Sequence, residues 1–152
     1  MVRAGDLRLA AALAAVGLRI VEHPGADGGL GTSLAAGAAG TPADAGWLIA
    51  LVDMPWVQPE TISALVQALA AGASLVGPIC AGRRGHPVGF SPLWRDQLLN
   101  LKGDQGARDH IAAQPEQLIL LPTQDPGVLL DVDTPADFPS LHRFPSLHRS
   151  AV

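Results

Sequence analysis

Apolar residues along the chain fall into two patterns, short continuous runs and segments at helical spacing. The helical spacing predicts helices over residues 7–15, 32–39, 59–71, 92–99 and 107–113. The continuous runs predict strands over residues 18–22, 47–52, 74–80, 117–121 and 128–132. The run over 47–52 does not alternate between apolar and polar positions, which is typical of strands covered on both faces. The pattern therefore predicts an α/β fold in which helices cover a mostly parallel sheet.

The composition is that of a folded protein. The chain has 152 residues, of which 48% are hydrophobic and 16% are charged, and its formal net charge is −4. Intrinsic disorder requires low hydrophobicity and high net charge, so this composition argues against it. Nucleic-acid-binding proteins carry a clustered basic excess, which this sequence lacks. The single cysteine, Cys80, excludes an internal disulfide and a CxxC site, so we expect a reducing, cytoplasmic environment.

The two ends of the sequence need separate interpretation. The apolar run Leu9–Leu18 is about half as long as a membrane span and loosely resembles a signal peptide, but an alanine-rich helix explains it equally well. At the other end, Phe138–Arg143 is repeated at once as Phe144–Arg149. This repeat is far shorter than those that build solenoids. We therefore expect one domain over residues 1–138, a duplicated and flexible tail over residues 139–152, and no membrane segment.

Acidic residues stand where two of the predicted strands end. In open α/β sheets, ligands bind beyond the carboxyl ends of the strands. Asp53 follows one such strand, and Asp131 and Asp133 share one side at the end of another. Like charges this close need a cation or hydrogen-bond donors, and Mg²⁺ accepts carboxylate and phosphate oxygens as ligands. The structural alternative is that Asp53 caps a turn and that Asp133 or Thr134 caps the start of a helix.

Basic residues occur in two glycine-rich segments. Gly82–Phe90 contains Arg84 and His86. A later segment contains Lys102 and Arg108 just before a predicted helix, whose N-terminus favours anions. Glycine lets the backbone approach a ligand closely, and arginine offers a planar group of donors to phosphate. Together with the acidic residues, these segments indicate magnesium-assisted handling of a phosphorylated ligand.

Several of these segments occur together in a recognisable order. They are GLGTSL at 29–34 with Gly37, LVDMP at 51–55 with PETI at 59–62, RGHPV at 84–88, LKGDQGAR at 101–108 and DVDTPAD at 131–137. In this order they resemble the MobA-like nucleotidyltransferase family, and within it the molybdenum cofactor cytidylyltransferase branch. A sugar-nucleotide glycosyltransferase would share the fold class but would not require RGHPV or GDxGAR.

The resemblance implies a fold, a reaction and a set of site residues. The fold would be a three-layer, Rossmann-like α/β fold of the nucleotide-diphospho-sugar transferase kind. The reaction would transfer a nucleotidyl group, typically cytidylyl from CTP, to a molybdopterin-type cofactor with release of pyrophosphate. Asp53, Asp131 and Asp133 would be the catalytic residues, with Mg²⁺ held by Asp53 and by one of the other two. Nucleotide and pterin phosphate would lie near Gly31, Ser33, Arg84, His86, Lys102, Asp104 and Arg108.

The sequence departs from the family pattern in one respect. Members of the family begin with a strand and a glycine-rich loop that reads roughly LAAGxSxRMG and is followed by a lysine. The sequence contains no such segment, so we expect a fold that lacks this first strand and loop, with exposed strand edges through which copies could associate. Two interpretations stay open: a nucleotidyltransferase that is impaired as this shortened chain, and a non-catalytic remnant or partner subunit of the same fold.

Overall fold

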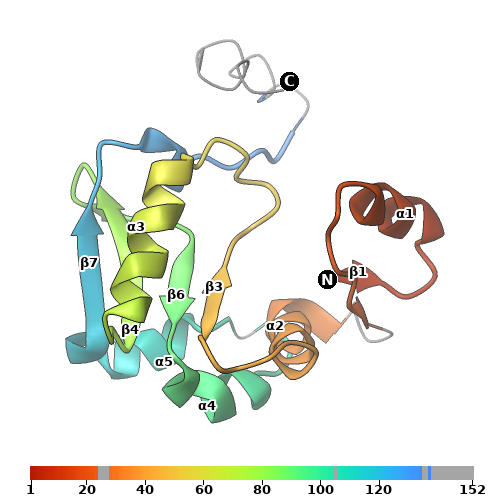
Figure 1. The fold of residues 1–152 in the computed structure, drawn as a ribbon, viewed down its shortest axis with the longest axis horizontal. Coiled ribbons are helices and arrows are strands. Elements are labelled where there is room, and N and C mark those ends of the chain that lie inside the picture. The colour runs from red at the N-terminus through yellow and green to blue at the C-terminus, as the bar shows by residue number, and fades with distance from the viewer. Residues whose placement is uncertain (24–27, 105, 135–136, 138–152) are drawn as a thin grey trace. The chain divides into compact units, whose positions relative to one another are not determined.

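The computed structural model describes residues 1–23, 28–104, 106–134 and 137 (Figure 1). These residues form two compact units. The first unit contains residues 1–47 and 90–118, and the second contains residues 48–89 and the described residues from 119 onward. The duplicated tail predicted over 139–152 lies outside the described residues.

The first unit is mainly helical. Its helices are α1 (Leu7–Ala15), α2 (Gly29–Ala39), α4 (Arg95–Leu99) and α5 (Arg108–Ala113), with 3₁₀ turns at Pro92–Trp94 and Pro115–Gln117. Helix α1 spans the predicted residues, and the Asp6 carboxylate caps it by accepting a hydrogen bond from the Leu9 N–H (3.0 Å). Two short strands, β1 (Val2–Arg3) and β2 (Glu22–His23), pair in parallel. Helix α2 packs against α4.

A five-stranded sheet forms most of the second unit. Its strands are β3 (Trp47–Ile49), β4 (Leu75–Cys80), β5 (Arg83–Arg84), β6 (Val88–Phe90) and β7 (Leu118–Pro122). The order is β3-β6-β4-β5, and β7 also pairs with β4. Strands β4 and β5 are antiparallel, whereas Figure 1 shows β3, β4 and β7 running in one direction and β6 in the other. The predicted α/β fold with a mostly parallel sheet is confirmed, and the structure adds that this sheet is mixed, because β5 runs antiparallel to β4.

Helix α3 (Pro59–Ala70) covers one face of this sheet and packs on β4 (Figure 1). Pro59 stands at the first helical position, where its missing N–H costs no hydrogen bond. The buried centre of the contact is Leu65 with Ala73 and Val76, around which Leu48, Ala68, Leu69 and Leu121 pack. Among the described residues, no helix has both the length and the apolar character that crossing a membrane requires.

Two of the predicted strands are wrong. Instead of a strand over 128–132, Pro126–Leu129 forms a 3₁₀ turn (η4), and residues 130–132 belong to no strand. The Asp125 carboxylate fixes this turn by accepting a hydrogen bond from the Gly127 N–H (2.9 Å). The strand predicted over 18–22 is reduced to Glu22–His23.

Three other predicted elements have different bounds. The predicted strand 47–52 ends at Ile49, and the predicted helix 92–99 is divided into the Pro92–Trp94 3₁₀ turn and α4. Helix α2 begins at Gly29, whereas the pattern placed a loop up to Gly31. It gains this extra turn because the Gly103 carbonyl accepts a hydrogen bond from the Gly31 N–H (2.8 Å) and so satisfies a donor at the helix start.

Candidate functional site

Asp53 lies in an exposed turn that follows β3. The Met54 N–H donates to the Leu51 carbonyl (3.3 Å), which closes the turn. The Asp53 carbonyl in turn accepts a hydrogen bond from the Val132 N–H (2.8 Å). This bond brings the Asp131–Asp133 segment against the Asp53 turn, although the two are far apart in the sequence. The three acidic side chains predicted to share a site are all exposed to solvent.

A local turn, closed by the Asp137 side chain, follows the Asp131–Asp133 segment. The Asp137 carboxylate accepts hydrogen bonds from the N–H groups of Asp133 (3.2 Å) and Thr134 (2.7 Å). It also accepts one from the Thr134 hydroxyl (2.9 Å), and these bonds to Thr134 lower the pKa of Asp137. Asp133 thus contributes its backbone N–H to this turn, whereas the helix start predicted at Pro135, with Asp133 or Thr134 as its cap, lies outside the described residues.

Arg84 and His86 belong to a segment that packs on η4, the turn that precedes Asp131–Asp133. The His86 N–H donates to the Val128 carbonyl (3.0 Å), and the Gly85 N–H donates to the Pro78 carbonyl (3.0 Å). A Cβ on Gly85 would lie 2.2 Å from the Val128 oxygen, so only glycine permits this approach. The structure thus brings together, within the second unit, the sequence motifs that contain Asp53, Arg84, His86, Asp131 and Asp133.

His86 is electrostatically coupled to both of its charged neighbours. Burial lowers the pKa of the half-buried His86 imidazole, the Asp53 carboxylate raises it, and the Arg84 guanidinium lowers it. The His86 Nδ1 atom is buried and has no hydrogen-bond partner within the described part of the chain. Buried polar atoms are normally paired, so this nitrogen is an exception among the described residues.

Asp125 is a residue of this region that the sequence analysis missed. Its side chain is only 6% exposed. The carboxylate accepts hydrogen bonds from the Gln58 N–H (2.8 Å), the Thr61 hydroxyl (2.8 Å) and the Gly127 N–H (2.9 Å). It therefore joins the start of α3 to the η4 turn. The Asp-Pro-Gly sequence at 125–127 signals a turn, but nothing local indicates the contact with α3.

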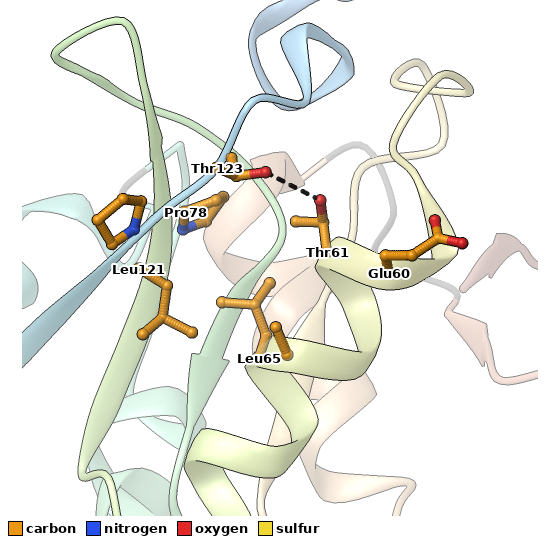
Figure 2. Close-up of a pocket in the computed structure, with 8 residues that line it drawn as sticks. Glu60, Thr61, Leu65, Pro78, Leu121 and Thr123 are labelled. Carbon is orange, nitrogen blue, oxygen red and sulfur yellow. Dashed lines mark hydrogen bonds between the residues drawn. The ribbon is translucent and has the colours of Figure 1, made fainter.

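A pocket of about 150 Å³ lies between α3 and the β4–β7 strands (Figure 2). It is lined by Glu60, Thr61, Ala64, Leu65, Pro78, Leu121, Pro122 and Thr123. The hydroxyl oxygens of Thr61 and Thr123 are 3.4 Å apart at one end of it, and the rest of the lining is mostly apolar. The sequence analysis did not predict this pocket.

Two segments of the first unit that contain predicted site residues meet at the start of α2. The Gly103 carbonyl accepts hydrogen bonds from the N–H groups of Gly31 (2.8 Å) and Thr32 (3.4 Å), and the Gly103 N–H donates to the Thr32 hydroxyl (3.0 Å). Gly29 has a φ of 90°, and a Cβ there would lie 2.3 Å from the Asp104 Oδ1 atom. The segment predicted to bind the pterin phosphate is thus joined to the segment predicted to lie near the nucleotide.

The remaining predicted residues of the first unit are less closely tied to this contact. Ser33 is half-buried in the first turns of α2, and Lys102 is exposed just before Gly103. Arg108 is exposed at the first position of α5. Their predicted roles toward ligand phosphates stay predictions.

The atoms near Asp53 that could bind a metal suit a hard divalent cation better than a soft one. They are carboxylate oxygens at a solvent-exposed site, and Mg²⁺ is usually held by one or two protein carboxylates together with water and substrate phosphates. Within the described residues, no group of three or more His, Cys, Asp or Glu side chains forms a ready-made metal site.

Comparison with known families decides the assignment. The family described as MobA-like NTP transferase domain matches residues 1–118. The chain belongs to this family. The match includes Asp53, Arg84 and His86, whereas the segment with Asp131 and Asp133 follows it in the sequence. The chain is therefore a nucleotidyltransferase domain, and its substrate class is nucleoside triphosphates.

Solved structures of mycobacterial proteins resemble this MobA-like domain. Rv0371c of Mycobacterium tuberculosis in complex with manganese gives a TM-score of 0.72 at 26% identity, over 91% of this chain and 73% of that chain. A second structure of Rv0371c gives 0.67 at 25% identity, over 89% and 72%. The Rv0371c homologue of Mycobacterium sp. strain JC1 gives 0.68 at 24% identity, over 87% and 68%, and supports the fold alone. A search of curated proteins found no match.

Proposed function

We propose that this MobA-like domain transfers a cytidylyl group from CTP to the phosphate of a molybdopterin-type cofactor and releases pyrophosphate. The observation that carries the proposal is the 2.8 Å hydrogen bond from the Val132 N–H to the Asp53 carbonyl. This bond brings the two acidic motifs of the resemblance together, beside Arg84 and His86. We further propose that the reaction takes place in the cytoplasm, because the sequence has one cysteine and no disulfide.

In this reaction a phosphate oxygen of the pterin attacks the α-phosphorus of CTP. A new phosphorus–oxygen bond forms, the bond from the α-phosphorus to the bridging oxygen breaks, and pyrophosphate leaves with that electron pair. Asp53, with Asp131 or Asp133, would hold Mg²⁺, which offsets charge on the α-phosphate when bound. The manganese complex of Rv0371c supports the use of a divalent cation by this fold.

The chain's own groups would act by positioning. The exposed Arg84 guanidinium can form paired hydrogen bonds with a phosphate, and the half-buried His86 imidazole would hydrogen-bond the same group. For the first unit, the sequence resemblance assigns Lys102, Asp104 and Arg108 to the pterin phosphate and Gly31 and Ser33 to the nucleotide. Because no covalent intermediate is required, holding both phosphates in line would supply most of the rate.

The test measures pyrophosphate release from CTP in the presence of the pterin cofactor and Mg²⁺, with GTP, ATP and UTP in parallel. Asp53→Asn should lower kcat/KM by about a hundredfold. Asp44→Asn removes an exposed carboxylate elsewhere in the sequence and should leave kcat/KM unchanged. Equal activity of the Asp53→Asn variant and the parent would contradict the assignment of Asp53.

The alternative function is a non-catalytic or partner subunit of the same fold. One observation favours it: the Gly31 and Thr32 N–H groups donate to the Gly103 carbonyl, so α2 does not offer them to a phosphate. A chain that binds Mn²⁺ but releases no pyrophosphate from any of the four nucleotides would support this alternative. Activity that depends on a second protein would identify the partner-subunit form of it.

A further inference from the structure

The buried Asp125 carboxylate contacts both chain segments from which the proposed cation site is built. One oxygen, Oδ2, accepts hydrogen bonds from the Gln58 N–H and the Thr61 hydroxyl, both at 2.8 Å. The other oxygen, Oδ1, accepts from the Gly127 N–H at 2.9 Å. The first pair belongs to the start of α3, which directly follows the Asp53 turn, and the last belongs to the segment that leads to Asp131.

Backbone packing makes this junction tight. A Cβ on Gly127 would lie 2.1 Å from the Trp56 carbonyl oxygen, so the η4 turn lies directly on the loop between Asp53 and α3. On the other side of η4, the Val128 carbonyl accepts the His86 N–H (3.0 Å). Farther along, the Val132 N–H reaches the Asp53 carbonyl (2.8 Å). A shift of η4 would therefore be transmitted to the acidic segment and to the His86 turn.

The geometry points to Asp125 as a positioning residue that sets the spacing between Asp53 and the Asp131–Asp133 carboxylates, and with it the affinity for a divalent cation. This inference rests on the proposed function, because it needs a cation at that site. Asp125 would act through its neighbours, in the way that hydrogen-bonding partners of metal ligands tune a site from outside. The competing interpretation is that Asp125 only caps α3, in which case its loss would affect stability alone.

The experiment combines two measurements on the metal-free full chain. The Kd for Mn²⁺ is measured by titrating the electron paramagnetic resonance signal of the free ion. Hydrogen exchange of the Val132 amide, whose N–H binds the Asp53 carbonyl, is measured by NMR with the Leu65 amide in α3 as the internal reference. Both are measured well below the melting temperature of every variant.

The main variant is Asp125→Asn, which keeps the shape but places an amide donor against the Gln58 N–H. We expect the Kd for Mn²⁺ to rise about tenfold or more. Val132 should exchange about tenfold faster relative to Leu65, as for the loss of one hydrogen bond to a charged group. The matched control is Glu60→Gln, which removes the same charge from an exposed position in the first turn of α3 and should leave both values unchanged.

A second pair of variants covers the case in which Asp125→Asn does not fold. Thr61→Val removes one donor to Asp125 without changing the net charge, whereas Thr61→Ser retains the hydroxyl. The valine variant should weaken Mn²⁺ binding and speed Val132 exchange, and the serine variant should restore both. This pattern separates positioning from a simple loss of helix stability.

Each other outcome has a definite meaning. A Kd for Asp125→Asn equal to that of Glu60→Gln, or unchanged relative exchange at Val132, overturns the inference. If the parent chain binds no Mn²⁺, the proposed cation site fails first. Val132 exchange then decides on its own whether Asp125 holds the two segments together, so the failures of the two ideas are distinguishable.

Discussion

Replacing Gly127 by alanine tests how closely the η4 turn packs on the loop that follows Asp53. The added Cβ would lie 2.1 Å from the Trp56 carbonyl oxygen and 2.8 Å from the Val57 nitrogen. Since Cβ atoms stay at least 3.0 Å from other atoms, the two backbones would have to separate by about 0.9 Å. The φ of Gly127 is not positive, so the clash, and not backbone strain, decides the effect.

The size of the effect follows from what must move. Overpacking a filled site costs about 1–3 kcal/mol, and we expect about 3 kcal/mol here because both clashing groups are backbone. For a chain of this length, a loss of 1 kcal/mol lowers Tm by about 2–4 °C. The Tm of Gly127→Ala, measured by circular dichroism, should therefore fall by about 6–12 °C. Urea unfolding should give a matching loss in the free energy of unfolding.

The control is Gly37→Ala, in the interior of α2. A Cβ there would lie 3.5 Å from the Met1 side chain, which is an ordinary contact. Alanine is favoured over glycine inside a helix by about 0.5–1 kcal/mol, so Tm should stay constant or rise. If Gly127→Ala melted within about 1 °C of the parent, the η4 turn would not pack on Trp56, and the argument for the junction at Asp125 would lose its steric basis.

Three further predictions concern other contacts. Gly29→Ala should lower the free energy of unfolding by about 2 kcal/mol in urea, because Gly29 has a φ of 90° and a Cβ would meet Asp104; an unchanged value would refute this contact. Burial lowers the pKa of the His86 imidazole below 6.5, so the unfolded chain binds a proton at His86 more tightly than the folded chain does. The metal-free protein should therefore lose stability as the pH falls below 6.5. Urea unfolding at pH 5 and pH 7.5 should show a smaller difference for His86→Gln. Hydrogen bonds from the Thr134 N–H and hydroxyl hold the pKa of Asp137 below 3.8. Thr134→Val removes only the hydroxyl bond and should raise this pKa in part in an NMR titration, and an unchanged value would contradict that bond.

The elements that the sequence predicted well are those whose pattern is local and whose ends carry their own signals. Helix α3 begins at Pro59 as predicted, because proline suits the first helical position. Strand β4 (Leu75–Cys80) is a continuous apolar run and is buried along almost its whole length. In both elements the burial and the local preference agree, so a single sequence suffices to place them.

The predictions failed where hydrogen bonds, and not the apolar pattern, determined the backbone. Residues 128–132 are apolar enough for a strand, but the Asp125 carboxylate binds the Gly127 N–H and turns the chain into η4. Helix α2 begins early because the Gly103 carbonyl caps its first N–H groups. The Gly103 partner lies far from α2 in the sequence, so the residues around α2 do not reveal it. The Asp125 turn is local, but the apolar run that follows it outweighed its Asp-Pro-Gly signal in the prediction.

The motifs of the candidate site could be found in the sequence, but the way in which they are assembled could not. Motif spacing identified Asp53, Arg84, His86, Asp131 and Asp133, and the structure brings their motifs together in the second unit. What joins them is backbone: the Val132 N–H on the Asp53 carbonyl and the His86 N–H on the Val128 carbonyl. A backbone hydrogen bond places no demand on residue type, so it leaves no pattern in a sequence.

Close backbone contacts do restrict the residue type where they leave no room for a Cβ atom, because only glycine then fits. At Gly85 and at Gly127 a Cβ would lie 2.2 Å and 2.1 Å from a carbonyl oxygen of another segment, Val128 in the first case and Trp56 in the second. The two glycines therefore allow the η4 turn to be packed from both sides, against the His86 turn and against the loop after Asp53. The sequence indicates that something approaches closely at each, but only the structure identifies what. It follows that substitutions at these glycines should change the affinity for a divalent cation even though neither residue has a side chain to offer it.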